Sequence, residues 1–191
     1  MDLASLTRSR SQRAVTAEQR IPAHDVLLDA TLTVPLGARG VVLLPYASSA
    51  GRFDRRHRFA AEVLEQAGLG TLQIDLLTPA EEAMFANGSQ GADQVALLAQ
   101  RIAVGIVWLG KQADTSQLAV GVFASKRETP AAVAAAARSV GVSALVSNGG
   151  GLDPTTVATA PPAIPTLLLL GVEELARAEE LAAEFFGQHL I

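Results

Sequence analysis

Hydrophobic and polar positions in this chain follow two alternating patterns. Short runs that are wholly apolar or rich in β-branched residues predict strands, and apolar residues spaced three and four apart predict helices. Strands are predicted at 26–34, 41–44, 71–75, 118–123, 144–147 and 166–170, and helices at 54–67, 93–111, 131–138 and 173–190. Strand and helix therefore alternate along most of the chain, interrupted by a polar, glycine-bearing excursion over 78–91.

An antiparallel hairpin is predicted at the start of this alternation. Residues 14–21 are expected to pair with 26–34 across Pro22-Ala23-His24-Asp25. The later apolar strands are typical of a parallel sheet that is buried on both faces. The pattern predicts a three-layer α/β/α sandwich with a mostly parallel sheet and an N-terminal antiparallel hairpin. Since no internal repeat or linker interrupts it, residues 14–191 are expected to form a single domain.

Composition excludes several classes of function. The 191 residues are 49% apolar, which is enough for a full core. The formal net charge of −4 argues against a general nucleic-acid-binding protein. No apolar run approaches the ~20 residues that a membrane-spanning helix needs. We therefore expect a cytoplasmic protein without nucleic-acid or membrane partners.

The N-terminus is rich in arginine, with Arg8, Arg10, Arg13 and Arg20. An apolar segment of the kind that a secretory signal requires is missing there. We expect residues 1–13 to be a flexible arm, and a targeting segment is the alternative.

Chemistry is limited by the absence of cysteine and by the presence of only three histidines, His24, His57 and His189. Disulfides, cysteine-ligated metals and thiol nucleophiles are therefore excluded. The segment after the strand at 41–44 contains neither the glycine pattern of a dinucleotide-binding loop nor a P-loop. We expect no metal and no cofactor.

Several stretches resemble the dienelactone-hydrolase-like branch of the α/β-hydrolase family. They are GVVLLP at 40–45, EQAGLGTL at 65–72, DLLTPAEE at 75–82, VWL at 107–109 and PTLLLLG at 165–171. The resemblance implies an α/β-hydrolase fold that cleaves esters or lactones with a Ser, Asp and His triad. The serine of such a triad stands on a strained turn within Gly-x-Ser-x-Gly, between a strand and a helix.

The nucleophile turn of that family is altered in this chain. Aligned without gaps, the nucleophile position falls on Lys126, between Ala124 and Glu128, where the family has two small residues. Taken instead as the nucleophile, Ser125 lies between Phe123 and Arg127, and that frame also lacks the small pair. We expect an ordinary loop that leaves Ser125 in solvent and ends where Thr129 caps the next helix.

The other catalytic positions are altered as well. The acid position of the family falls on Glu174, but the residues after it predict one continuous helix, so the sheet is expected to be shortened at the C-terminus. None of the three histidines falls at the place of the family's catalytic histidine: His24 is predicted in the hairpin turn, His57 on the surface and His189 at the end of the last helix.

The oxyanion loop of the family carries a histidine and a glycine where this chain has Tyr46 and Ala47. Tyr46 is expected to place a bulky side chain where the acyl group of a substrate would lie. Lys126 and Arg127 are candidates for binding an anion near the start of the next helix, although a solvated loop is the favoured interpretation.

Two functional hypotheses follow. The first is an α/β-hydrolase-fold protein that has lost hydrolysis and binds a small-molecule ligand or a protein partner, with homo-oligomerisation covering its sheet edge. The alternative is an active carboxylic-ester or lactone hydrolase that uses Ser125, Glu174 and an unconventional histidine, either His57 or the His189 of another subunit.

Overall fold

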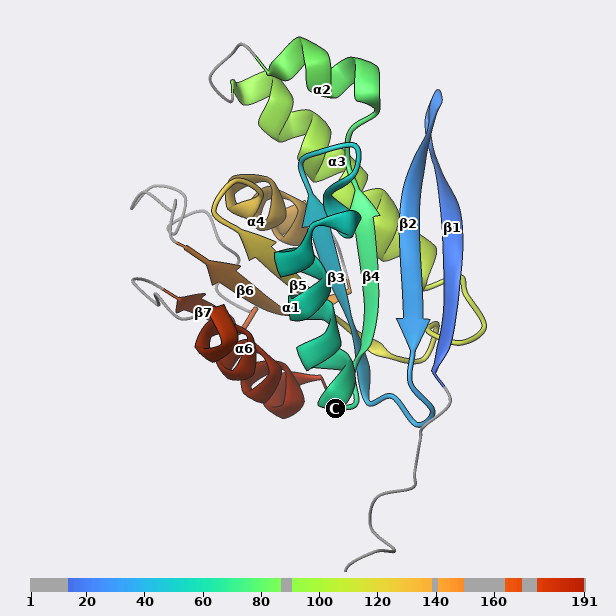
Figure 1. Cartoon of the computed structure of the whole chain (residues 1–191), viewed down its shortest axis with the longest axis vertical. Coiled ribbons are helices and arrows are strands. Elements are labelled where there is room, and N and C mark those ends of the chain that lie inside the picture. The colour runs from blue at the N-terminus through green and yellow to red at the C-terminus, as the bar shows by residue number, and fades with distance from the viewer. Residues whose placement is uncertain (1–13, 87–90, 139–140, 150–163, 170–174, 191) are drawn as a thin grey trace, which may run out of the picture.

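A seven-stranded sheet forms the centre of the molecule. The computed structural model describes residues 14–86, 91–138, 141–149, 164–169 and 175–190. The strands are β1 (Val15–Ala23), β2 (Val26–Val34), β3 (Gly40–Tyr46), β4 (Gly70–Asp75), β5 (Ala119–Ser125), β6 (Val142–Asn148) and β7 (Thr166–Leu169). They lie in the order β1-β2-β4-β3-β5-β6-β7 (Figure 1). The pairs β1–β2 and β2–β4 are antiparallel and the remaining pairs are parallel, which confirms the predicted sheet.

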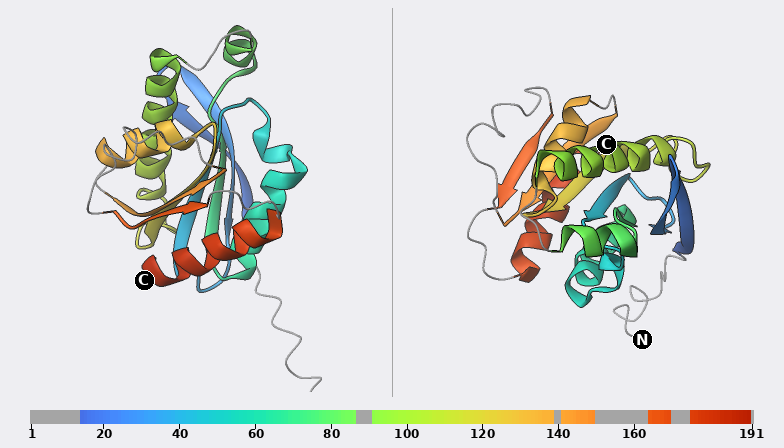
Figure 2. Two further views of the ribbon diagram at one scale, coloured as in Figure 1. Left: turned by 90° about the vertical axis from the view of Figure 1, so that its left-hand side faces the viewer. Right: turned by 90° about the horizontal axis from the view of Figure 1, so that it is seen from above.

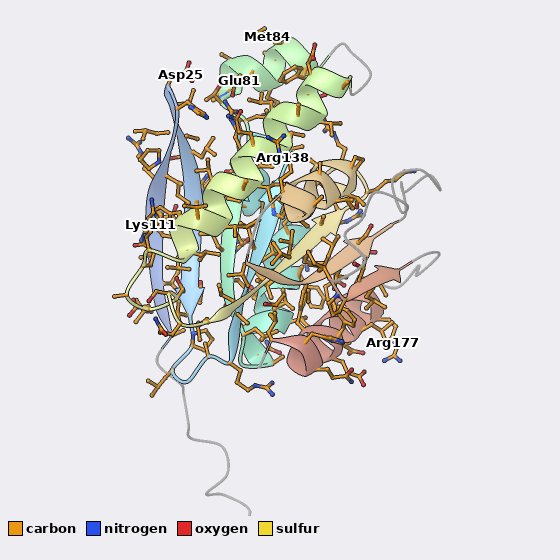
Figure 3. The ribbon with its side chains drawn as sticks, turned by 180° about the vertical axis from the view of Figure 1, so that it is seen from behind. Asp25, Glu81, Met84, Lys111, Arg138 and Arg177 are labelled. Carbon is orange, nitrogen blue, oxygen red and sulfur yellow. The ribbon has the colours of Figure 1, made fainter. Side chains whose placement is uncertain are left out.

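Helices cover both faces of this sheet. On one face lie α1 (Arg55–Gln66) and α6 (Leu175–His189), and on the other α3 (Ala92–Leu109) and α4 (Thr129–Arg138) (Figure 2). Figure 3 shows α3 and α4 side by side, with Lys111 just beyond the end of α3. Two buried apolar clusters separate these layers. The three-layer sandwich is therefore confirmed.

The hairpin has a tighter turn than the sequence predicts. Strands β1 and β2 pair from Val15 with Val34 up to Ala23 with Val26, which leaves His24 and Asp25 as the turn. His24 has a φ of 56°, in the left-handed region that two-residue hairpin turns require. His24 is therefore in the hairpin turn, as predicted.

A short helix, α2 (Pro79–Phe85), occupies much of the excursion expected over 78–91. Thr78 and Glu81 form a capping box, and Pro79 stands in the first turn, where its missing N–H costs nothing. Arg101 on α3 donates to both carboxylate oxygens of Glu81, at 2.7 and 2.6 Å, and to the carbonyl oxygen of Leu76 at 2.6 Å. These bonds lower the pKa of Glu81 to about 2 and fix α2 against α3.

Helix α3 is apolar enough, by length and composition alone, to cross a membrane. One side of it packs into the core through Leu98, Ile102, Ile106 and Leu109. Its hydrophobicity is thus explained by the core of the sandwich. On the first helix, Ala60 and Leu64 are buried, whereas Phe59 is 37% exposed.

The last helix lies very close to the sheet. Phe186 and Leu190 are fully buried, and Phe186 packs on Gly121 of β5. A Cβ atom at Gly121 would lie 2.6 Å from Cε1 of Phe186. The absence of a side chain at residue 121 therefore sets the distance between α6 and β5.

We predict that Gly121→Ala lowers the free energy of unfolding by about 1–3 kcal/mol, because the added methyl group overpacks this contact. Urea denaturation measures the change. Shortening the opposing ring in the Gly121→Ala, Phe186→Leu double variant should cost less than the sum of the two single changes. Strict additivity would show that the two residues are not coupled.

Candidate functional site

The carboxyl ends of β3, β5 and β6 surround a cavity of about 210 Å³. In sheets of this kind, ligands bind at the carboxyl ends of the strands. The first helix and the last helix close its sides. The lining residues are Leu44, Pro45, Tyr46, Arg56, His57, Ala60, Phe123, Ser125, Asn148 and Glu179.

The loop after β3 is held by three carboxylates. The backbone N–H of Ala47 donates to Glu128 at 2.9 Å, that of Ser49 to Glu82 at 2.9 Å, and that of Arg52 to Asp75 at 3.0 Å. These acids belong to three different elements: the turn before α4, the helix α2 and the strand β4. The conformation of the loop therefore depends on parts of the chain that are distant in sequence.

Glu128 makes the contact that decides what this site can do. Its side chain is buried, with 5% exposed, and its second oxygen accepts a hydrogen bond from the hydroxyl of Ser125. Ala47 is, with Tyr46, one of the two residues that the family resemblance places in the oxyanion loop. One carboxylate thus binds both the N–H of Ala47 and the hydroxyl of Ser125. Ser125 is exposed, in agreement with the prediction of a solvated residue, although it ends β5 rather than lying in a loop.

The turn between β5 and α4 explains how Glu128 reaches this position. The N–H of Glu128 bonds to the carbonyl of Ser125 at 3.0 Å, and its own carbonyl accepts from Ala132 at 2.9 Å. The predicted helix cap is displaced by one residue, because Thr129 is already helical and its hydroxyl donates to the carbonyl of Ser125 at 2.9 Å. These hydrogen bonds fix the backbone of the turn, and the side chain of Glu128 extends from it to the loop after β3.

The imidazole of His57 lies against the ring of Tyr46 in this cavity. The two rings stack with centroids 4.1 Å apart. Nδ1 of His57 is 2.8 Å from the carbonyl oxygen of Gly51, and since a carbonyl only accepts, this nitrogen carries the proton. The prediction that His57 is a surface residue is wrong, because His57 is half-buried and lines the cavity.

Tyr46 forms one wall of the cavity. Its hydroxyl lies 3.4 Å from Oε1 of Gln73, and burial raises the pKa of the phenol well above its ordinary value, helped by the nearby charges of Asp75 and Glu128. The bulky side chain expected at this position is therefore present in the wall, and a cavity remains beside it.

Glu179 on α6 was not among the residues that the sequence singled out. Only 2% of it is exposed, and its Oε2 has no hydrogen-bond partner in the described part of the chain. Burial raises the pKa of this carboxyl to about 7. The signal that could have found it is its spacing, because Glu179 lies next to Ala178 and three residues before Ala182 on the buried stripe of the helix.

The other candidate residues are not brought together at this cavity. Lys126 and Arg127 are exposed in the turn before α4, where their expected role with anions stays a prediction. His189 bonds through Nδ1 to the carbonyl of Phe185 at 2.8 Å, as suits its predicted place at the end of the last helix. Glu174 lies outside the described residues, as do residues 1–13. Across the described ranges, no cluster of His, Asp and Glu could hold a metal ion.

We predict that Glu128→Ala lowers the free energy of unfolding by about 1–3 kcal/mol, because the buried N–H of Ala47 loses its acceptor. Glu128→Gln keeps an oxygen for that N–H and should cost less. Urea denaturation of both variants tests this, and equal losses would contradict the role given to the Ala47 bond.

We predict that Glu179→Gln removes a pH dependence of stability. Because the pKa is near 4.5 in the unfolded chain and about 7 in the folded one, the neutral form favours folding at low pH. This contribution is lost as the pH rises from about 4.5 to about 7, and amounts to roughly 3 kcal/mol. Urea denaturation measures the free energy of unfolding of both proteins at pH 4 and pH 8. Relative to the native protein, the variant should be more stable at pH 8 than at pH 4. The same difference in stability at both pH values would contradict the prediction.

Comparison with known proteins places this geometry in a family. No family model matches the chain. Two curated proteins of Mycobacterium tuberculosis, from the strains CDC 1551 / Oshkosh and H37Rv, are each 41% identical over 155 residues, covering 81% of this chain. Both are named "putative phosphoribosyl transferase". The match covers 34% of each of them, so the chain spans about a third of the length of these relatives.

Solved structures extend the comparison over nearly the whole chain. The dienelactone hydrolase of Anabaena variabilis is 30% identical, with 93% of this chain and 99% of that chain covered and a TM-score of 0.77. Est1E of Butyrivibrio proteoclasticus is 12% identical, with 90% and 98% covered and a TM-score of 0.63, which is a likeness of fold alone. With its hairpin, its parallel sheet and this degree of identity, the chain belongs to the dienelactone-hydrolase-like branch of the α/β-hydrolase family.

Proposed function

We propose that this chain is a non-hydrolytic member of its family that binds a small ligand in the cavity at the strand ends. The observation that carries the proposal is the carboxylate of Glu128 between the N–H of Ala47 and the hydroxyl of Ser125. Ester hydrolysis needs that N–H free to receive the negative charge of the tetrahedral intermediate.

The contact of Glu128 with the N–H of Ala47 should lower the rate of ester hydrolysis strongly. Removing one oxyanion donor from a serine hydrolase lowers kcat by about 10²–10³. Here the N–H of Ala47 already donates to another group, and that group, the carboxylate of Glu128, is itself an anion. A second negative charge developing beside the buried carboxylate of Glu128 would be repelled by it. The same residue thus opposes the transition state in two ways.

Hydrolysis by Ser125 with Glu174 and His57 is the alternative. It is favoured by one observation, that Ser125 and His57 line the same cavity. Against it, His57 is held by the carbonyl of Gly51 and by Tyr46, while the Ser125 hydroxyl donates to Glu128. Forming a serine–histidine pair would require Ser125 to give up its present bond.

The remaining expectations keep the status of predictions. The transferase name belongs to relatives about three times as long as the part matched, and we propose no transferase activity for this chain. Homo-oligomerisation and a cytoplasmic location are also proposals, while the core position of α3 fits a soluble protein.

Release of nitrophenol from short-chain nitrophenyl esters tests the proposed function. We expect the native protein and Ser125→Ala to release it at the same background rate. The His57→Gln variant is the matched control for the alternative. Turnover that disappears in both Ser125→Ala and His57→Gln would show that the chain is a serine hydrolase and would overturn the proposal.

A further inference from the structure

Glu179, a buried residue with one unpartnered carboxyl oxygen in the described part of the chain, forms part of the wall of the strand-end cavity. Glu179 lines this cavity, only 2% of the residue is exposed, and Oε2 makes no hydrogen bond to the described residues. Buried carboxyl groups are normally paired, because an ionised one loses its hydration. A group placed in this way favours a ligand that donates hydrogen bonds.

The helix that carries Glu179 holds the carboxyl in place. Ala178, Ala182 and Phe186 are all buried on the same side of α6, with at most 1% exposed. The close approach of Phe186 to Gly121 fixes the depth of the helix on the sheet. The position of the backbone at Glu179 is therefore fixed relative to the sheet.

We infer that the cavity binds a small primary ammonium compound with an apolar body, and that the ammonium group lies against the carboxylate of Glu179. This inference rests on the binding role proposed above and names the class of its ligand. An ammonium group donates hydrogen bonds and also supplies the opposite charge, so it offsets the burial of the carboxylate better than a neutral hydroxyl does.

The rest of the cavity suits an apolar body. Leu44, Pro45, Ala60 and Phe123 contribute apolar walls. The cavity has a volume of about 210 Å³. A single small ring with a one-carbon arm is a compound of that size.

Other polar groups face the cavity from the neighbouring elements. Arg56 and His57 come from α1, Ser125 from β5 and Asn148 from β6. Arg56 is exposed, so water screens its repulsion of a cation. Glu128, which accepts from Ser125, adds a second negative charge beside the cavity. Glu179 is nevertheless the acidic side chain that lines the cavity itself.

Benzylamine and its neutral counterpart, benzyl alcohol, provide the test. Calorimetric titration at pH 8 should show benzylamine binding at least about tenfold more tightly than benzyl alcohol. Glu179→Gln should remove this preference, whereas Glu180→Gln, which changes the exposed neighbour on the same helix, should leave it unchanged. Thermal melting of both variants confirms that they are folded.

The dependence on pH identifies the group responsible. Because burial raises the pKa of Glu179 to about 7, the carboxylate that an ammonium group needs forms between pH 6 and pH 8. The affinity for benzylamine should rise over this interval in the native protein and stay level in Glu179→Gln. A rise of the same size in the variant would assign the effect to another group and overturn the inference.

The outcome separates this inference from the proposed function. Equal affinity for the amine and the alcohol, or no binding of benzylamine, overturns the inference even when ester hydrolysis is absent. Serine-dependent hydrolysis together with benzylamine binding at Glu179 would overturn the non-hydrolytic assignment and support the ammonium site.

Discussion

The carboxylate of Glu128 joins the end of β5 to the loop after β3, and the character of the site depends on this one bridge. A glutamate there satisfies a backbone N–H that the fold leaves pointing into the site. It also holds the hydroxyl of Ser125 in a fixed direction. The bridge stabilises the strand ends, and the same contacts are the basis of the proposed absence of hydrolysis.

Most of the fold could be predicted from sequence because local patterns determine it. Apolar runs mark the strands, and the pairing of β1 with β2 follows from their proximity in the chain. The helix α2 is the main omission, although Thr78, Pro79 and Glu81 form a recognisable start signal. This helix is short and no residue of it is buried, so it lacks the apolar stripe from which helices are recognised. Its contacts with the rest of the fold come from Arg101 and Ser49, which are distant in the sequence.

The site was predicted less well, for a different physical reason. Altered positions at residues 46, 47 and 126 are visible in the sequence because they depart from a local motif. The partners that fill the site are not visible, because the Glu128 contact spans 81 positions along the chain and depends on tertiary packing. His57 stands in a charged segment of the sequence, and its stacking on Tyr46 and its bond to the carbonyl of Gly51 place it at the cavity. Glu179 lies in an amphipathic helix that also has exposed glutamates, and its residue type does not distinguish it from them.

The pairing of Arg101 with α2 has a consequence for how sequences of this type can diverge. Glu81 and Glu82 are consecutive, and the first binds Arg101 while the second binds the N–H and hydroxyl of Ser49. A replacement at residue 101 would thus free the helix that positions the loop before the cavity, although Arg101 itself is not among the lining residues. Three residues from two helices should accordingly be inherited as a unit, and a lineage that loses the arginine should lose the two glutamates as well.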